Sequence, residues 1–239
     1  MNIHPNKDII LKHLGTIEYQ HAWDFQAKVF DTIVQHKIAN RSLPYDQQTI
    51  TTNYLFLCEH PHVYTLGKSG KPENLLLAPE ILAAQDISYV HINRGGDITY
   101  HGPGQLVAYP IMDMDNFFTD IHRYLRFLEE VVIQTLAYFQ IQAGRIAGLT
   151  GVWVDFELQT NPRKIAAFGV KMSRWVTMHG LALNVNTDLA YFKNIVPCGI
   201  ADKAVTSMQQ ELGKPINMLA VEQVFLEKFE QIFDAHLHL

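Results

Sequence analysis

The sequence RGGDITYHGPGQLVAY, residues 94–109, is the most informative stretch of this chain. It places four glycines, one proline and several polar side chains within a segment that begins and ends in strand-like sequence. Glycine permits positive φ and lets backbone N–H groups approach a bound group closely, while Arg94, Thr99, His101 and Gln105 supply hydrogen-bonding side chains. Tight turns between strands explain the glycines but not the arginine or the histidine that precedes them. The stretch therefore predicts a ligand-binding loop.

The segments around this loop alternate between strand-like and helix-like patterns. Short runs rich in β-branched and aromatic residues predict strands at residues 50–58, 62–66, 88–93, 97–111, 151–156, 164–171 and 175–186. Apolar residues at three- and four-residue spacing predict helices at residues 22–39, 121–140 and 218–236. Thr119 or Asp120 is placed to cap the second helix, and Asn217 the third. This order predicts an α+β domain whose helices pack on one side of a mainly antiparallel or mixed sheet.

Each predicted helix has an apolar stripe, which we assign to the core rather than to a cofactor site. The stripes are Trp23, Ala27, Phe30, Val34 and Ile38, then Leu125, Leu128, Val132, Leu136 and Phe139, then Val221, Phe225, Phe229 and Ile232 or Phe233. The chain has no internal repeat, no low-complexity segment and no linker long enough to divide it, although residues 158–163 resemble an exposed loop. We therefore expect a single domain over residues 1–239.

The composition is that of a soluble globular protein, with 48% hydrophobic and 18% charged residues. No apolar run approaches the ~18 residues needed to span a bilayer, and the opening MNIHPNKDII lacks the features of a signal peptide. We therefore expect a cytoplasmic protein that does not bind membranes. The net charge of −5 argues against general nucleic-acid binding. With no coiled-coil seam evident, a monomer is expected.

The charge is unevenly distributed along the chain. Between residues 161 and 203, six basic residues stand against two acidic ones, so this segment carries +4 and the remainder −9. Such a segment can steer an acidic carrier protein towards the molecule. Scatter along the surface explains the same numbers, and the sequence leaves both interpretations open.

The two cysteines have different surroundings. Cys198 lies between Pro197 and Gly199, where a fixed φ on one side and a free backbone on the other suit a side chain presented from a tight turn. Cys58 lies in the apolar run YLFLCE, which predicts core packing. Two cysteines are too few for a disulfide framework, so both are expected to be free thiols. Cys198 is the candidate nucleophile.

A nucleophilic cysteine needs a nearby base or cation, because a thiol with a pKa near 8.5 is little ionised at neutral pH. On chemistry alone, His101 and His179 are candidates for this role, as they are for purely structural hydrogen bonding. The repeats His60-Pro61-His62 and His236-Leu237-His238 suggest a metal site only weakly. No cysteine pair accompanies them, and the second lies in a tail expected to be frayed. We expect no metal and no cofactor.

Five motifs of this chain resemble those of the octanoyltransferases of the lipoate-protein ligase B family. The first is Arg-Gly-Gly, two residues, then Thr-Tyr-His-Gly-Pro-Gly-Gln. The others are Glu59-His60-Pro61 with Val63-Tyr64-Thr65 and Gly67, Lys164-Ile165 followed by Gly169, residues 179–186 (HGLALNVN), and Pro197-Cys198-Gly199. They occur in the family's order over roughly residues 55 to 205. The resemblance implies the fold that lipoate ligases share with the catalytic domain of biotin protein ligases.

The resemblance also implies a reaction. The donor would be octanoyl-acyl carrier protein, and the acceptor a lysine of a lipoyl domain, in a 2-oxoacid dehydrogenase E2 subunit or the glycine cleavage H protein. Cys198 would form an octanoyl thioester, and Lys164 would act as acid and base in this first step of protein lipoylation. No ATP is needed, because a thioester is already activated. Two alternatives remain at this stage: an ATP-dependent lipoate or biotin ligase, and a non-catalytic module that binds the acyl carrier or the lipoyl domain.

By the same resemblance, three segments would bind the acyl chain. The first is Arg94, Gly95, Gly96, Asp97, Ile98, Thr99, Tyr100 and His101; the second is Ala167, Phe168 and Gly169; the third is Gly180, Leu181 and Ala182. Small residues beside Phe168 and Leu181 suit the walls of a narrow apolar tunnel. Burying about six methylenes at ~0.8 kcal/mol each would contribute a few kcal/mol to recognition.

Overall fold

The computed structural model describes residues 5–196 and 204–239. Over these residues a large mixed sheet has the strand order β12-β1-β2-β6-β10-β9-β8-β7, with β11 beside β9. Its strands are β1 (Asp8–Thr16), β2 (Asn53–Glu59), β6 (Gln105–Ile111), β7 (Ala143–Ile146), β8 (Leu149–Val154), β9 (Arg163–Ser173), β10 (Val176–Asn184), β11 (Ala204–Val205) and β12 (His236–His238). A small sheet consists of β4 (Ser88–His91), β3 (Val63–Leu66) and β5 (Ile98–His101). The prediction of an α+β fold with a mixed sheet is confirmed.

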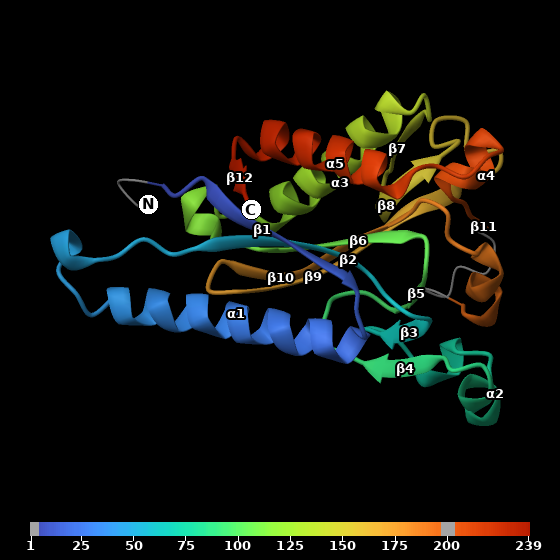
Figure 1. The fold of residues 1–239 in the computed structure, drawn as a ribbon, viewed down its shortest axis with the longest axis horizontal. Coiled ribbons are helices and arrows are strands. Elements are labelled where there is room, and N and C mark those ends of the chain that lie inside the picture. The colour runs from blue at the N-terminus through green and yellow to red at the C-terminus, as the bar shows by residue number, and fades with distance from the viewer. Residues whose placement is uncertain (1–4, 197–203) are drawn as a thin grey trace.

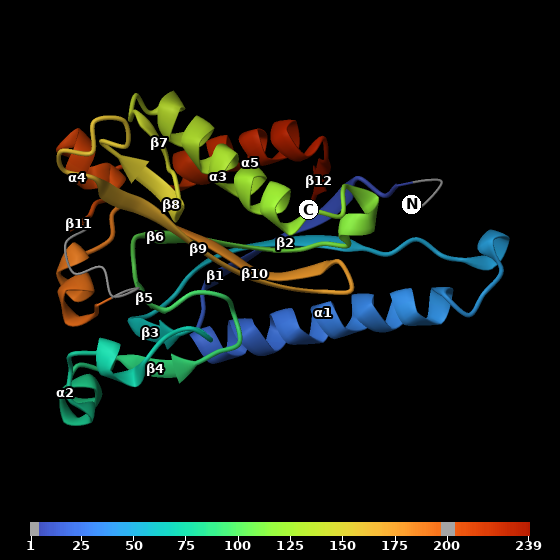
Figure 2. The ribbon, with the colours of Figure 1, turned by 180° about the vertical axis from the view of Figure 1, so that it is seen from behind.

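Helices cover both faces of the large sheet (Figure 1; Figure 2). They are α1 (Tyr19–Asn40), α2 (Pro79–Ala84), α3 (Ile121–Tyr138), α4 (Met208–Leu212) and α5 (Met218–Phe233). One core joins α3 and α5 to the sheet, and a second joins α1 to the opposite face. The expectation that all helices lie on one side is therefore wrong. The central strands β6 and β10 are buried along their whole length because both of their faces are covered.

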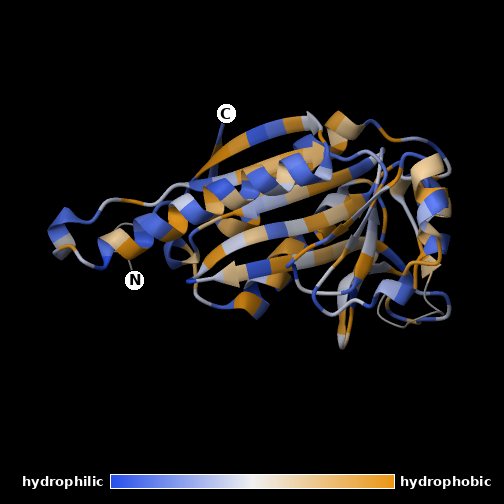
Figure 3. Cartoon of the chain, turned by 90° about the horizontal axis from the view of Figure 1, so that it is seen from below, coloured by the Kyte–Doolittle hydropathy of each residue, from blue (hydrophilic) through white to orange (hydrophobic). Residues whose placement is uncertain are grey.

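The predicted stripe of α1 is wrong at its C-terminal end. Ile38 is 37% exposed, whereas Gln26 and Lys37 are buried. Lys37 turns inward because its ammonium forms ion pairs with Asp113 and Asp115. Figure 3 shows that α1 carries both hydrophilic and hydrophobic residues along its length. Periodicity identified the helix correctly but did not reveal the polar partners beneath it.

The other two long helices agree well with prediction. Asp120 caps α3, since its carboxylate accepts hydrogen bonds from the backbone N–H groups of His122 and Arg123 at 2.8 and 3.0 Å. Asn217 caps α5 in the same way through Ala220. None of the helices in the described ranges is long and apolar enough to cross a bilayer.

Strands at the edges of the large sheet escaped prediction. The C-terminal residues 236–238, expected to be frayed, form β12, which pairs in parallel with β1. β1 in turn pairs in parallel with β2. These strands have little apolar alternation of their own, and β12 is only three residues long. Neighbouring strands supply their hydrogen-bond partners, which no local pattern reveals.

Candidate active site

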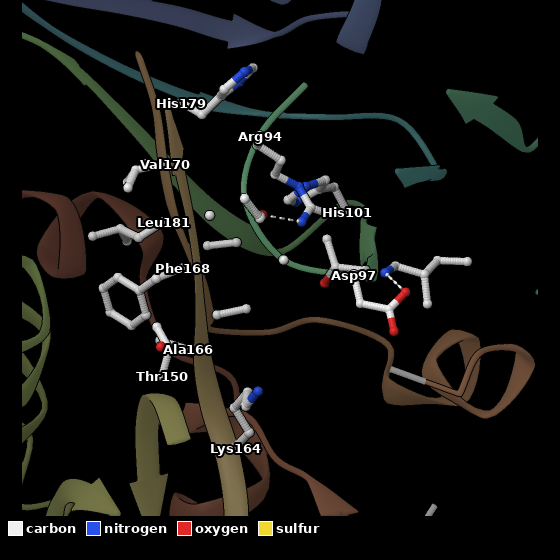
Figure 4. A pocket seen from close by; sticks show the side chains of 18 of the residues that line it. Arg94, Asp97, His101, Thr150, Lys164, Ala166, Phe168, Val170, His179 and Leu181 are labelled. Atoms are coloured by element: carbon white, nitrogen blue, oxygen red, sulfur yellow. Dashed lines mark hydrogen bonds between the residues drawn. The ribbon is translucent and has the colours of Figure 1, made fainter. Parts of the chain in front are cut away.

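A cavity of about 570 Å³ opens where β9 and β10 meet the loop before β5 (Figure 4). Thirteen of the fourteen residues predicted to bind the acyl chain line it. The segments 167–169 and 180–182 face each other because Gly180 pairs with Gly169, and Leu181 with Phe168. The loop joins them through the backbone N–H of Gly95, which donates to the carbonyl oxygen of Val170 at 3.1 Å. Three segments far apart in sequence therefore form one site.

Tyr100 is the exception among the predicted residues. Its ring points to the other side of β5, where it stacks on Tyr191 with 4.9 Å between ring centroids. Side chains alternate along a strand, so Thr99 and His101 face the cavity while Tyr100 faces the small-sheet core. This side chain has a packing role.

The walls of the cavity are mainly apolar. Phe168, Val170 and Leu181 come from the sheet, and Ile121 and Leu125 come from α3. Ile121 was not among the predicted site residues, and Leu125 was assigned to the core, because a helical stripe does not distinguish a core position from a cavity wall. The arrangement suits an alkyl chain, whose burial the apolar walls favour.

Glycine at two strand positions follows from close contacts. A Cβ on Gly180 would lie 2.0 Å from the carbonyl oxygen of Ala108, and one on Gly169 would lie 2.7 Å from Cδ of Arg94. Any larger residue would push the neighbouring backbone or side chain away. These glycines thus set the spacing between the sheet and the loop.

Arg94 braces the loop from inside. Its side chain is only 7% exposed, and Nη2 donates to both the carbonyl and the hydroxyl oxygen of Thr65 at 2.9 Å. Nη1 donates to the carbonyl oxygen of Gly95 at 3.0 Å. Asp97 plays a similar part, accepting from Nδ2 of Asn74 at 2.8 Å. Arg94, which the sequence offers as a hydrogen-bond donor to a ligand, therefore also holds the loop itself.

His101 has a defined tautomer. Its Nδ1 lies 2.7 Å from Oε1 of Gln105, whose Nε2 donates to Oδ1 of Asn184, whose Nδ2 donates to the carbonyl oxygen of Thr206. Since an amide oxygen only accepts, Nδ1 of His101 carries the proton and Nε2 keeps its lone pair. Burial, with a smaller effect from His60, lowers the pKa of His101 to about 3. The ring is neutral at physiological pH.

His179 lies in β10 with a left-handed φ of 62°. Its backbone N–H donates to Oε1 of Gln26 at 3.1 Å, and its Nε2 lies 3.3 Å from Oδ1 of Asn93. Burial, followed by the charges of Arg94 and Lys171, lowers the pKa of His179 to about 3. Because neither His179 nor His101 is an imidazolium at neutral pH, neither suits the cationic partner of a thiolate.

Lys164 lies at the opposite end of the cavity from His179 (Figure 4). Its Nζ is 4.7 Å from the ring centroid of Trp153. Val205 of β11 pairs with Lys164, whose carbonyl oxygen accepts from the backbone N–H of Thr206 at 2.9 Å. An amine at this end of an apolar cavity can supply a positive charge or move a proton.

Cys198 lies outside the described residues, as do Pro197 and Gly199. The chain on either side of it is described up to Val196 and from Ala204. Val196 N–H donates to the carbonyl oxygen of Asn74 at 2.9 Å. Ile195 and Val205 both line the cavity. The described chain therefore stops next to one residue of the cavity wall, Ile195, and resumes next to another, Val205.

The remaining candidates have structural surroundings. Cys58 is buried as predicted, and burial raises the pKa of its thiol. His60 is held by the carbonyl oxygen of Ile17 and the hydroxyl of Tyr109 at 2.6 and 2.7 Å, and burial lowers its pKa to about 4. Nε2 of His238 lies 3.1 Å from Oδ1 of Asp8. Over residues 5–196 and 204–239, no three His, Cys, Asp or Glu side chains gather to hold a metal ion.

Comparison with known proteins gives a consistent result. The family described as lipoyl protein ligase A/B catalytic domain matches residues 18–230. An octanoyltransferase of Cytophaga hutchinsonii is 57% identical over 237 residues, covering 99% of this chain and 97% of that protein. One from Christiangramia forsetii is 54% identical, covering 97% and 98%. A bipartite lipoate protein ligase of Thermoplasma acidophilum has a similar fold, with a TM-score of 0.69 at 17% identity over 98% of this chain and 86% of that one.

Proposed function

Since the chain belongs to the lipoyl protein ligase A/B catalytic domain family and is an octanoyltransferase, we propose that Cys198 carries the octanoyl group as a thioester. One observation supports this most strongly. The predicted acyl-binding segments line a single apolar cavity that has Lys164 at one end. Ile195, three residues before Cys198 in the sequence, lines this cavity.

In the first half-reaction, the Cys198 sulfur attacks the carbonyl carbon of octanoyl-acyl carrier protein. A new carbon–sulfur bond forms to Cys198, and the bond to the carrier's sulfur breaks. The proton lost by Cys198 passes through Lys164 to the departing carrier thiol. The products are the octanoyl-enzyme and the free carrier, with no net change of charge and no need for ATP.

In the second half-reaction, the amine of an acceptor lysine attacks the Cys198 thioester. A carbon–nitrogen bond forms, the bond to Cys198 breaks, and the proton lost by the amine passes through Lys164 to the Cys198 sulfur. The product is an amide, and the enzyme returns to its starting state. Lys164 suits this relay because a neutral amine accepts a proton and an ammonium donates one.

The charge of Lys164 also favours the reactive form of the thiol. An ammonium about 4 Å from a thiolate contributes ~4 kcal/mol at an effective dielectric constant near 20, before desolvation is subtracted. Half of that energy lowers a thiol pKa by more than one unit. The neutral state of His101 and His179 leaves Lys164 as the cation best suited to this role among the described residues that line this end of the cavity.

The partners follow from the reaction. The donor is octanoyl-acyl carrier protein, and the acceptors are lipoyl domains of 2-oxoacid dehydrogenase E2 subunits and the glycine cleavage H protein. A monomer in the cytoplasm meets both. Two basic residues of segment 161–203 have partners within the chain: Arg163 of β9 pairs with Glu211, and Lys171 of the same strand lies over the ring of Phe30. The net positive charge of this segment can steer an acidic carrier protein towards the enzyme.

The direct test is the intact mass of the enzyme after brief incubation with octanoyl-acyl carrier protein. We expect a gain of one octanoyl group in the wild type and in Cys58→Ala, but not in Cys198→Ser. Octanoate with ATP is expected to give no acyl-enzyme and no acylated lipoyl domain. An adduct that survives in Cys198→Ser, or transfer that depends on ATP, contradicts the proposal.

A further inference from the structure

A buried carboxylate lies on the inner face of α3, close to the end of the cavity where Lys164 lies. We call this the reacting end of the cavity. Glu129 has 0% exposure, which is costly for a carboxylate unless it is well paired. Its Oε2 pairs with Arg126 at 2.7 Å and with Arg145 at 3.0 Å. Its Oε1 accepts a hydrogen bond from the backbone N–H of Gly151 in β8 at 3.1 Å. Glu129 therefore fixes one point of β8 to the helix that covers it.

That point is where β8 is distorted. Gly151 has a φ of 138°, which L side chains rarely adopt, and the pairing of β8 with β9 shifts register between Val152 and Trp153. A Cβ on Gly151 would lie 3.1 Å from Cε of Lys164 and 3.2 Å from Nε1 of Trp153. The distortion thus brings the backbone of β8 against both of these side chains.

Trp153 follows this distortion and contacts Lys164. The indole is 2% exposed, lines the cavity, and has the Nζ of Lys164 4.7 Å from its ring centroid. Indole attracts a cation more strongly than the other aromatic rings do, and the attraction grows when water is excluded. A lysine side chain has four flexible methylenes, so a fixed attractive surface limits where its ammonium lies.

We propose that Trp153 is a positioning residue that holds the ammonium of Lys164 at the reacting end of the cavity, and that Glu129 sets the place of Trp153 through Gly151. The inference rests on the proposed role of Lys164 in octanoyl transfer. It differs from simple core packing in one respect: the indole acts through Lys164, so its contribution depends on that side chain being present.

A spectroscopic test examines the contact without any reaction. In protein labelled with ¹³C-lysine, the ε-methylene resonance of Lys164 is identified by its loss in Lys164→Arg. We expect its proton shifts to lie upfield of ordinary lysines because of the indole ring current, to return to ordinary values in Trp153→Leu, and to stay partly shifted in Trp153→Phe. Lys171, over the ring of Phe30 at 4.8 Å, is an internal reference that Trp153 variants leave unchanged.

A kinetic test examines the consequence. We expect Trp153→Leu to lower kcat about tenfold, equivalent to ~1.4 kcal/mol, with little change in KM. Trp153→Phe keeps most of the activity, and Glu129→Gln shows a smaller loss of kcat than Trp153→Leu. In a Lys164→Met background, Trp153→Leu is expected to cost nothing further, because the interaction that it removes is already absent.

Two results overturn the proposal: an unshifted Lys164 resonance in the wild type, or a loss in Trp153→Leu that is the same with and without Lys164. If Trp153→Leu fails to fold, the wild-type spectrum and Trp153→Phe still decide. A shifted resonance in an enzyme that forms no octanoyl adduct would refute the proposed function while leaving the Trp153–Lys164 contact standing.

Discussion

The two ends of the β9–β10 ribbon carry the same kinds of contact in different surroundings. Lys164 lies over Trp153 at 4.7 Å, and Lys171, on the same strand, lies over Phe30 at 4.8 Å. Lys164 lines the cavity beside β11, whereas Lys171 packs on α1 towards the hairpin turn. A cation over an aromatic ring therefore does not by itself indicate a catalytic role. What separates the two lysines is the cavity, which Lys164 lines and Lys171 does not.

Left-handed backbone shows the same contrast. Arg174 and Trp175, with φ of 49° and 62°, form the two-residue turn that joins β9 to β10, where positive φ matches the twist of the strands. His179 has a φ of 62° inside β10, with its side chain buried at the cavity. In the turn the conformation serves chain reversal; at His179 it accompanies a functional site.

The largest predicted effect separates the two lysines. Lys164→Ala is expected to lower the rate of octanoyl transfer by ~10²- to 10⁴-fold, the usual range for loss of a general acid and base. Lys171→Ala is the matched control and should stay within about twofold, because its ammonium does not line the cavity. The steady-state rate of octanoyl transfer to a lipoyl domain measures the effect of each variant. Equal losses in the two variants would contradict a special role for Lys164.

Gly180→Ala tests the tight spacing at the cavity end. Its Cβ would meet the backbone oxygen of Ala108 at 2.0 Å, so we expect a loss of about 3 kcal/mol in the free energy of unfolding. Gly95→Ala is the milder comparison, since its Cβ would have 3.3 Å to the nearest atom. Denaturant titration compares them, and a Gly180→Ala protein as stable as wild type would show that the strands can separate freely.

The buried histidines at the cavity end make stability depend on acidity. His101 is neutral when folded, with a pKa of about 3, whereas an unfolded histidine titrates near 6.5. The unfolded state binds more protons between these values, so stability falls as pH drops below ~6.5. Between pH 7 and 5 this contributes about 2 kcal/mol, which His101→Gln should remove from the pH dependence of unfolding.

A matched change at the turn should leave that dependence intact. Trp175→Phe changes an exposed side chain and leaves the buried histidines in place. The free energy of unfolding of this variant should therefore fall with decreasing pH as in the wild type. If His101→Gln and Trp175→Phe gave the same slope between pH 7 and 5, the buried neutral state of His101 would be wrong.

The smallest predicted effect is a gain in stability from changes in the turn between β9 and β10. Asn-Gly suits a two-residue turn with positive φ at both positions, so Arg174→Asn with Trp175→Gly should raise the free energy of unfolding by ~1 kcal/mol. Octanoyl transfer should be unchanged. Thermal unfolding and a transfer assay check both points. A loss of transfer would extend the functional region to the far end of the ribbon.

The sequence predicted the loop, the strands that form the cavity and the helix caps, because glycine spacing, alternation and capping residues act locally. It did not reveal that Leu125 lines the cavity or that Arg94 braces the loop, since both depend on elements distant in the chain. Lys37 and Gln26 were missed for the same reason: their partners, Asp113 and His179, lie on other elements. Buried polar side chains were the least predictable feature.

The pH dependence of Cys198 alkylation measures whether the charge of Lys164 raises the reactivity of the Cys198 thiol. We expect a midpoint well below ~8.5 in the wild type and in Lys171→Ala, and a midpoint at least about one unit higher in Lys164→Ala. The same midpoint in all three proteins would contradict this expectation.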